Sequence, residues 1–289
     1  MKRRALLGHG AALAGLAALK CFSCRLYAAP ARKLASDRLR LGPMRVELSR
    51  MALGTGTNGV GGSSNQTRKL GLRGLADLLA AGYDQGVTFW DSADQYGTHP
   101  HLKAALQRVP REKVTILSKT HAYSERDMRA DLERFRRELG TDYIDILLLH
   151  AVMDAGWPER RRGAMAVLEE ARQKGIVRTC GASCHTLEAL KTAARSPWAQ
   201  VNLVRINPAG VAMDAGLETV LPVLRQMKAA GKGVIGMKIL GAGRLSRRAD
   251  ECLQFVLSLD CVDCFTLGCE SRAHLEDLLQ RIPAASVRG

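Results

Sequence analysis

The fold of this chain is decided by Asp142-Tyr143-Ile144-Asp145-Ile146-Leu147-Leu148-Leu149-His150, an apolar run that ends on a histidine. Two runs upstream have the same character. They are Thr88-Phe89-Trp90-Asp91-Ser92-Ala93-Asp94-Gln95-Tyr96-Gly97 and Val114-Thr115-Ile116-Leu117-Ser118-Lys119-Thr120. Apolar runs of this length are typical of parallel strands that are buried on both faces. Each run therefore predicts a buried strand with a chemically useful residue at or just past its carboxyl end.

Segments with helical character separate these strands, and the alternation continues along the chain. Alternating strands and helices favour an α/β fold with a parallel sheet. A (β/α)8 TIM barrel takes about 250 residues, so one such domain accounts for most of the 289 residues. A hairpin is expected at 38–48. The predicted strands are 51–54, 87–92, 114–119, 143–149, 177–183, 201–206, 233–239 and 263–268; the predicted helices are 69–85, 99–109, 125–139, 161–174, 187–196, 216–231, 247–258 and 272–281.

The N-terminus reads Met1-Lys2-Arg3-Arg4-Ala5-Leu6-Leu7 and continues as an apolar run to Leu19. Paired arginines before such a run resemble a twin-arginine export signal, and the run is short for a membrane span of about 20 residues. We predict a leader over 1–31 that engages the export machinery and a barrel over 32–289, with the protein in the periplasm. The alternatives are an uncleaved leader that associates with the membrane surface, and a cytoplasmic protein if the leader does not function.

The net charge of +15 is concentrated near the N-terminus, where residues 1–40 hold nine Lys or Arg and one acid. The arginine clusters at 134–137 and 160–162 are interpreted as solvated helix faces. The charge therefore does not favour nucleic-acid binding, and it is more typical of attraction to anionic cofactors or membrane surfaces.

The carboxyl ends of barrel strands meet at one face, where the active site lies, so Asp91, Tyr96, Lys119 and His150 are expected to come together. A lysine close to a tyrosine lowers the pKa of its hydroxyl from about 10. Tyr96 is then a general acid tuned by Lys119, with Asp91 behind the lysine and His150 orienting a carbonyl group. This set suits proton delivery to a carbonyl oxygen, and a cofactor must supply the hydride.

On these residues the chain resembles the aldo-keto reductase family. Asp91 with Tyr96 five residues later, Lys119 after an apolar strand, and His150 closing its own strand match the catalytic tetrad of that family residue by residue. The resemblance runs from about Leu41 to Pro283. It implies an eight-stranded barrel, with a hairpin across its floor, that uses a nicotinamide nucleotide, usually NADPH, to reduce an aldehyde or ketone to an alcohol.

The run Gly54-Thr55-Gly56-Thr57-Asn58-Gly59 fits G-x-G-x-x-G, but a flexible-looking loop follows it where a dinucleotide fingerprint would open a helix. We interpret it as the turn after the first strand, which the resemblance places beside the cofactor; a plain turn is the alternative. The segments after strands 7 and 8 often bind phosphate in barrels. There, Ser271 is expected to cap the last helix and Arg272 to reach a phosphate.

Several positions depart from the family pattern. Ser183-Cys184 replaces the Ser-Asn that holds the nicotinamide amide, Leu203 replaces a glutamine, Met237 replaces the stacking aromatic residue, and Glu270 replaces a basic residue near the adenosine phosphate. NADP is the expected cofactor, with NAD as the alternative. The candidate cofactor-binding residues are Gly56, Thr57, Ser183, Cys184, Met237, Lys238, Gly241, Gly268, Ser271 and Arg272.

Eight cysteines are many for a barrel, but Cys261 and Cys264 form a single C-x-x-C without the second pair of a structural zinc site. Most are interpreted as small buried apolar residues, and no metal ligand is assigned. Two alternative functions stay open: a redox-sensing barrel that binds nucleotide with little turnover, and a metal-associated oxidoreductase. Trp90, His121 and Trp157 are weaker candidates to line the substrate pocket.

Overall fold

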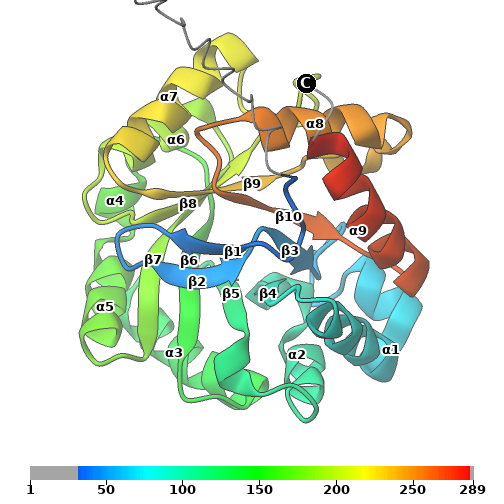
Figure 1. The fold of residues 1–289 in the computed structure, drawn as a ribbon. Coiled ribbons are helices and arrows are strands. Elements are labelled where there is room, and N and C mark those ends of the chain that lie inside the picture. The colour runs from blue at the N-terminus through cyan, green and yellow to red at the C-terminus, as the bar shows by residue number, and fades with distance from the viewer. Residues whose placement is uncertain (1–31, 287–289) are drawn as a thin grey trace, which may run out of the picture. The chain divides into compact units, whose positions relative to one another are not determined.

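The computed structural model describes residues 32–286, in which parallel strands form a closed barrel surrounded by helices (Figure 1). Neighbouring strands follow the order of the chain, and the last pairs with the first. The predicted (β/α)8 barrel and its eight strands are therefore confirmed, whereas the predicted leader lies outside the described residues. The barrel strands are β3 (Met51–Gly54), β4 (Phe89–Asp91), β5 (Thr115–Thr120), β6 (Ile144–Val152), β7 (Val177–Cys184), β8 (Val201–Arg205), β9 (Gly233–Met237) and β10 (Cys264–Gly268).

The helices differ from the predicted ones mainly at their ends. The first begins four residues earlier than predicted, at a reciprocal capping box of Ser64 and Thr67, and is interrupted at Gly71, whose φ of 62° is not helical. No helix within residues 32–286 is long and apolar enough to cross a membrane. The helices are α1 (Asn65–Asp84), α2 (His99–Ala105), α3 (Glu125–Leu139), α4 (Trp157–Arg160), α5 (Arg162–Gln173), α6 (Leu187–Arg195), α7 (Leu217–Ala229), α8 (Ala249–Ser258) and α9 (Arg272–Ser286).

The predicted hairpin is formed by β1 (Arg38–Leu41) and β2 (Val46–Ser49) and lies across one end of the barrel (Figure 1). Leu41 and Leu48 are fully buried and belong to the same apolar cluster as the barrel interior. The Thr115 hydroxyl, at the start of β5, donates to the Glu47 carbonyl at 2.6 Å. The hairpin therefore closes the amino-terminal end of the barrel.

Candidate active site

The four predicted catalytic residues lie together at the carboxyl ends of three neighbouring strands. Asp91 ends β4, Lys119 lies near the end of β5, and His150 lies near the end of β6. Tyr96 ends a short 3-10 turn, η1 (Asp94–Tyr96), that follows β4. The Lys119 Nζ lies 4.8 Å from the centroid of the Tyr96 ring, and the Tyr96 and His150 rings meet edge to face at 5.7 Å. Three consecutive strands of the barrel thus bring the four side chains close together.

Lys119 is a buried cation whose charge is fully compensated. Its ammonium pairs with Asp91 Oδ1 and donates to the Ser92 carbonyl at 2.6 Å. The second Asp91 oxygen accepts from the Thr266 hydroxyl at 2.8 Å. Burial by itself lowers the pKa of Lys119, but Asp91 and Tyr96 outweigh it and raise that pKa above its ordinary value. Lys119 is therefore a fixed positive charge beside Tyr96.

The Tyr96 ring stands in a slot made by the turn after β3. A Cβ added to Gly56 would lie 2.1 Å from Tyr96 Cε2, and one added to Gly59 would lie 2.3 Å from Tyr96 Cδ1. Any residue other than glycine at either position would displace the ring. The glycine run was interpreted as a turn beside the cofactor, and its role against the tyrosine was missed. Gly59 is the residue in the sequence that could have indicated this packing, because a simple turn does not require a third glycine.

Burial raises the pKa of the Tyr96 hydroxyl, and the Lys119 charge only partly opposes this, so the net shift is upward. The sequence identified the correct partner for Tyr96, but the predicted net direction of the shift is wrong because burial outweighs the lysine. A raised pKa leaves Tyr96 protonated at neutral pH. The group is therefore available as a proton donor.

His150 is buried at the other side of Tyr96. Burial lowers its pKa far below the ordinary histidine value, and the charge of Lys119 acts in the same direction. The His121 ring stacks on it at 4.7 Å, and Arg161 donates to the His150 backbone carbonyl at 3.2 Å. His150 is therefore a neutral imidazole that can donate one hydrogen bond.

A groove of about 380 Å³ opens beside Tyr96 at the ends of β3, β9 and β10. The lining extends from Asp91 and Tyr96 to Glu270 and to His274 in the first turn of α9. The predicted cofactor residues that line the groove are Gly56, Thr57, Met237, Lys238 and Gly268.

The other five predicted cofactor residues do not line this groove. Ser183 and Gly241 are buried, and Cys184 belongs to the apolar cluster between strands and helices. Ser271 caps α9 as predicted, accepting from the backbone N–H of His274 at 3.1 Å. Arg272 pairs with Glu276 at 3.0 Å and lines a separate cavity between α1 and α9. Reaching the groove would require Arg272 to leave that pair.

The groove residues fit a nicotinamide nucleotide. Leu203 and Met237 form an apolar surface near the tetrad, Lys238 supplies positive charge, and small residues let the backbone lie close to a ligand. A Cβ on Gly268 would lie 2.1 Å from the Thr57 hydroxyl, so glycine is needed there. At the far end, Glu270 Oε1 accepts from Asn65 at 2.7 Å, and its other oxygen pairs with Lys69.

The cysteines can also be compared with their predicted role as buried apolar residues. The six cysteines among the described residues are free and buried, as predicted for most of them. Within residues 32–286, no group of three or more His, Cys, Asp or Glu is arranged to hold a metal ion.

Trp90 and Trp157 are buried in the outer apolar cluster, so they do not line the groove. The solvated-face interpretation is wrong for Arg134, which is half-buried, and for Arg161, which is only 3% exposed.

Comparison with known proteins agrees with this geometry. The chain is 25% identical over 236 residues to D-threo-aldose 1-dehydrogenase of Pseudomonas sp., which covers 68% of each chain. It is 28% identical over 151 residues to an NAD/NADP-dependent indole-3-acetaldehyde reductase of Schizosaccharomyces pombe; the match spans 47% of this chain and about half (49%) of that relative. A Klebsiella pneumoniae aldo-keto reductase in complex with NADP and acetate shares the fold, with a TM-score of 0.65 and 23% identity over 86% of this chain and 89% of that one. The sequence model of the aldo/keto reductase family matches residues 51–256, most of the chain, and the protein therefore belongs to the aldo/keto reductase family.

Proposed function

We propose that this protein uses a nicotinamide nucleotide to reduce a small aldehyde or ketone to an alcohol, with Tyr96 as the general acid. The buried Lys119 ammonium, held by Asp91 and the Ser92 carbonyl against the Tyr96 ring, is the observation that carries the proposal. Burying a charge is costly, and charges buried in a cleft are common at functional sites. A phenolate left at Tyr96 after proton transfer is the charge that Lys119 would stabilise.

The residues of the chain then have distinct roles. The nucleotide, when bound, supplies the hydride. The Tyr96 hydroxyl gives its proton to the carbonyl oxygen, and neutral His150 donates a hydrogen bond to the same oxygen and orients it. Asp91 keeps Lys119 charged, and Thr266 holds the second oxygen of Asp91.

We propose NADP as the cofactor, with NAD as the alternative. A relative named as NAD/NADP-dependent and a neighbouring structure that contains NADP support this choice. Met237 would lie against the nicotinamide, and Lys238 would attract the phosphates. Glu270 at the far end of the groove disfavours a 2′-phosphate and is the reason that NAD stays the alternative; its ion pair with Lys69 offsets part of that negative charge.

The test is a fluorescence titration of NADPH and NADH against the full chain, followed by turnover on a panel of aldehydes and ketones. We expect saturable binding of at least one nucleotide. Tyr96→Phe should keep that binding and lose about 10²- to 10⁴-fold in turnover, the usual contribution of a general acid. Folded protein that binds neither nucleotide would overturn the proposal, and full turnover in Tyr96→Phe would overturn the assigned acid. Tight binding without multiple turnover would favour the redox-sensing alternative.

We also propose that residues 1–31 direct export by the twin-arginine route, on the evidence of the Arg3-Arg4 pair and the apolar run after it. In a bacterium with a functional twin-arginine system, the wild-type protein should reach the periplasmic fraction. The double variant Arg3→Lys/Arg4→Lys should stay in the cytoplasm. Equal distribution of the two proteins would contradict the proposed route.

A further inference from the structure

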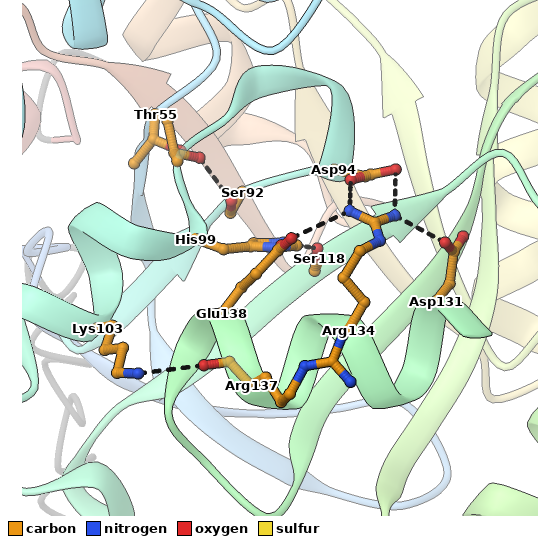
Figure 2. A network of polar contacts seen from close by, with 11 residues as sticks. Thr55, Ser92, Asp94, His99, Lys103, Ser118, Asp131, Arg134, Arg137 and Glu138 are labelled. Atoms are coloured by element: carbon orange, nitrogen blue, oxygen red, sulfur yellow. Dashed lines mark hydrogen bonds and ion pairs between the residues drawn. The ribbon is translucent and has the colours of Figure 1, made fainter. Parts of the chain in front are cut away.

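Figure 2 shows a polar network in which the Arg134 guanidinium contacts the carboxylates of Asp94, Asp131 and Glu138. Arg134 projects from α3 and forms a bidentate ion pair with Asp94. Its Nη1 donates to Asp94 Oδ1 at 2.6 Å, and its Nη2 donates to Asp94 Oδ2 at 2.9 Å. Asp94 opens the 3-10 turn that ends at Tyr96. The guanidinium is thus tied directly to the segment that carries the proposed acid.

A second arm of the network reaches the strand that carries Lys119. Arg134 Nη2 donates to Asp131 Oδ1 at 2.7 Å (Figure 2), and Asp131 Oδ2 accepts from the Thr120 hydroxyl at 2.5 Å. Thr120 is the residue directly after Lys119. The same guanidinium therefore restrains β5 on the carboxyl side of the lysine.

A third arm reaches the other side of Lys119. Arg134 Nη1 donates to Glu138 Oε1 at 3.3 Å, and Glu138 Oε2 lies 2.8 Å from His99 Nδ1. His99 Nε2 lies 2.7 Å from the hydroxyl of Ser118, the residue directly before Lys119 (Figure 2). Both neighbours of Lys119 are therefore connected through carboxylates to the guanidinium that holds the Tyr96 turn.

The turn needs support from outside because its own structure is weak. It is a three-residue 3-10 segment without a side-chain cap at Ala93, and such turns have poorer hydrogen-bond geometry than α-helices. It is followed by Gly97 at a φ of 64°, where a Cβ would collide with the Gly62 carbonyl oxygen at 1.9 Å. The internal backbone hydrogen bonds of the turn are Tyr96 N–H to the Ala93 carbonyl and Gly97 N–H to the Asp94 carbonyl, both 3.1 Å, so the position of Tyr96 also depends on contacts from outside the turn.

We propose that Arg134 is a positioning residue that holds Tyr96 and Lys119 in register for proton transfer. The inference rests on the proposed reductase function. Arg134, Asp131, Glu138 and His99 do not line the groove, so they would act through the residues they hold. A misplacement of about 1 Å at reacting groups can cost about 10²-fold in rate.

The same helix offers a matched control. Arg129 makes a similar two-pronged ion pair with Glu170, at 2.9 and 3.0 Å, but both side chains are about half exposed and Glu170 lies on the neighbouring helix α5. Arg129→Ala therefore removes a forked arginine from α3 without touching the Tyr96 turn or β5. We expect its turnover to remain within about twofold of the wild type, as for most exposed pairs.

The experiment compares Arg134→Ala, Arg134→Lys, Asp94→Asn and Arg129→Ala in the full chain. Arg134→Ala should lower kcat by about 10- to 100-fold with the nucleotide Kd unchanged, and Asp94→Asn should lower kcat in the same way. Arg134→Lys should recover only part of the loss, because an ammonium cannot bind a carboxylate in two-pronged fashion. Hydrogen exchange over residues 92–99 and 117–121 should accelerate in Arg134→Ala and not in Arg129→Ala.

Equal kcat and equal exchange in Arg134→Ala and Arg129→Ala would overturn the inference. A parallel loss of kcat and nucleotide affinity would also overturn it, because it would indicate a general structural role. If Arg134→Ala does not fold, Asp94→Asn tests the same contact from the turn. Failure of the proposed function is distinct from these outcomes: the wild type would then neither bind nucleotide nor turn over, while hydrogen exchange would still report whether Arg134 holds the two segments.

Discussion

The half of the site built by β4, β5 and β6 differs from the half built by β7 to β10. In the first half, Lys119 and Asp91 satisfy each other and their remaining partners are Ser92 and Thr266. Among the described residues, the first half leaves His150 Nδ1 buried without a hydrogen-bond partner, and the second half leaves side-chain atoms of Ser183, Asn202 and Asp214 in that state. Burial raises the pKa of Asp214 to about 6, with Arg205 3.3 Å away only partly opposing the shift.

The predicted match to the family's catalytic residues and the predicted departures from its cofactor-binding residues fall in different halves of the site. Lys119 and Asp91 depend on each other, since removing either one leaves a buried charge without its partner. Cys184, Leu203 and Met237, the positions predicted to depart from the family pattern, lie in the second half and take part in no ion pair. The first half is therefore held together by a buried ion pair between two of the chain's own side chains.

Lys119→Met should have the largest effect of any substitution in the first half of the site. It removes the cation beside Tyr96 and leaves the Asp91 carboxylate buried without an ion-pair partner. We expect turnover to fall by about 10³-fold or more and the free energy of unfolding to drop by about 3–5 kcal/mol. Steady-state kinetics and denaturant unfolding would measure the two losses.

The matched control for that variant is the double substitution Lys119→Met/Asp91→Asn. Neutralising the stranded carboxylate should restore part of the stability and none of the turnover. Recovery of both quantities would contradict the role assigned to the ammonium.

A smaller effect is expected from the slot that holds Tyr96. In Gly56→Ala the added Cβ must displace the ring, which should cost about 10- to 100-fold in kcat. Gly156→Ala is the control, because its Cβ would meet the nearest atoms at an ordinary 3.4 Å. Kinetics on both variants would test the slot, and equal rates would mean that the ring can be displaced without consequence.

In the second half of the site, Glu270 allows a test of the preference between NADPH and NADH. Replacing it with glutamine removes a negative charge at the far end of the groove, so the affinity for NADPH should rise relative to NADH by about fivefold, on the order of 1 kcal/mol. Asp277→Asn removes a charge from α9 at a residue that pairs with Arg281 and does not line the groove, so it should leave the ratio unchanged. Fluorescence titration with both nucleotides measures the ratio, and an unchanged ratio in Glu270→Gln would place the 2′-phosphate elsewhere.

The smallest expected effect is that of pH. Tyr96 is the acid while protonated, and its raised pKa preserves that form beyond its usual limit near pH 10. His150 stays neutral because its pKa lies far below its ordinary value of about 6.5. We therefore expect kcat for reduction to stay nearly flat from about pH 5 to 9. A step between pH 6 and 8 that disappears in His150→Asn would show that His150 does titrate in that range.

The two arginine clusters show the limit of predicting from sequence. Both were interpreted as solvated helix faces, which holds for exposed members such as Arg137 and Arg162. Arg134 and Arg161 belong to the same runs but point toward the site. A charge run does not reveal which of its members the rotation of the helix turns inward.

The sequence by itself predicted the barrel and the meeting of Asp91, Tyr96, Lys119 and His150 at one face, because buried parallel strands are continuous apolar runs and a polar residue stands at or just past the end of each run; the catalytic roles of the four residues stay a prediction. Only the tertiary structure decided that Gly59 packs against Tyr96, that Cys184 lies between strands and helices, and that Arg134 holds Asp94, which is 40 positions away. The physical reason is that a local pattern records whether a segment is buried. Which distant partner a side chain meets depends on how the closed barrel sets strand register and helix rotation.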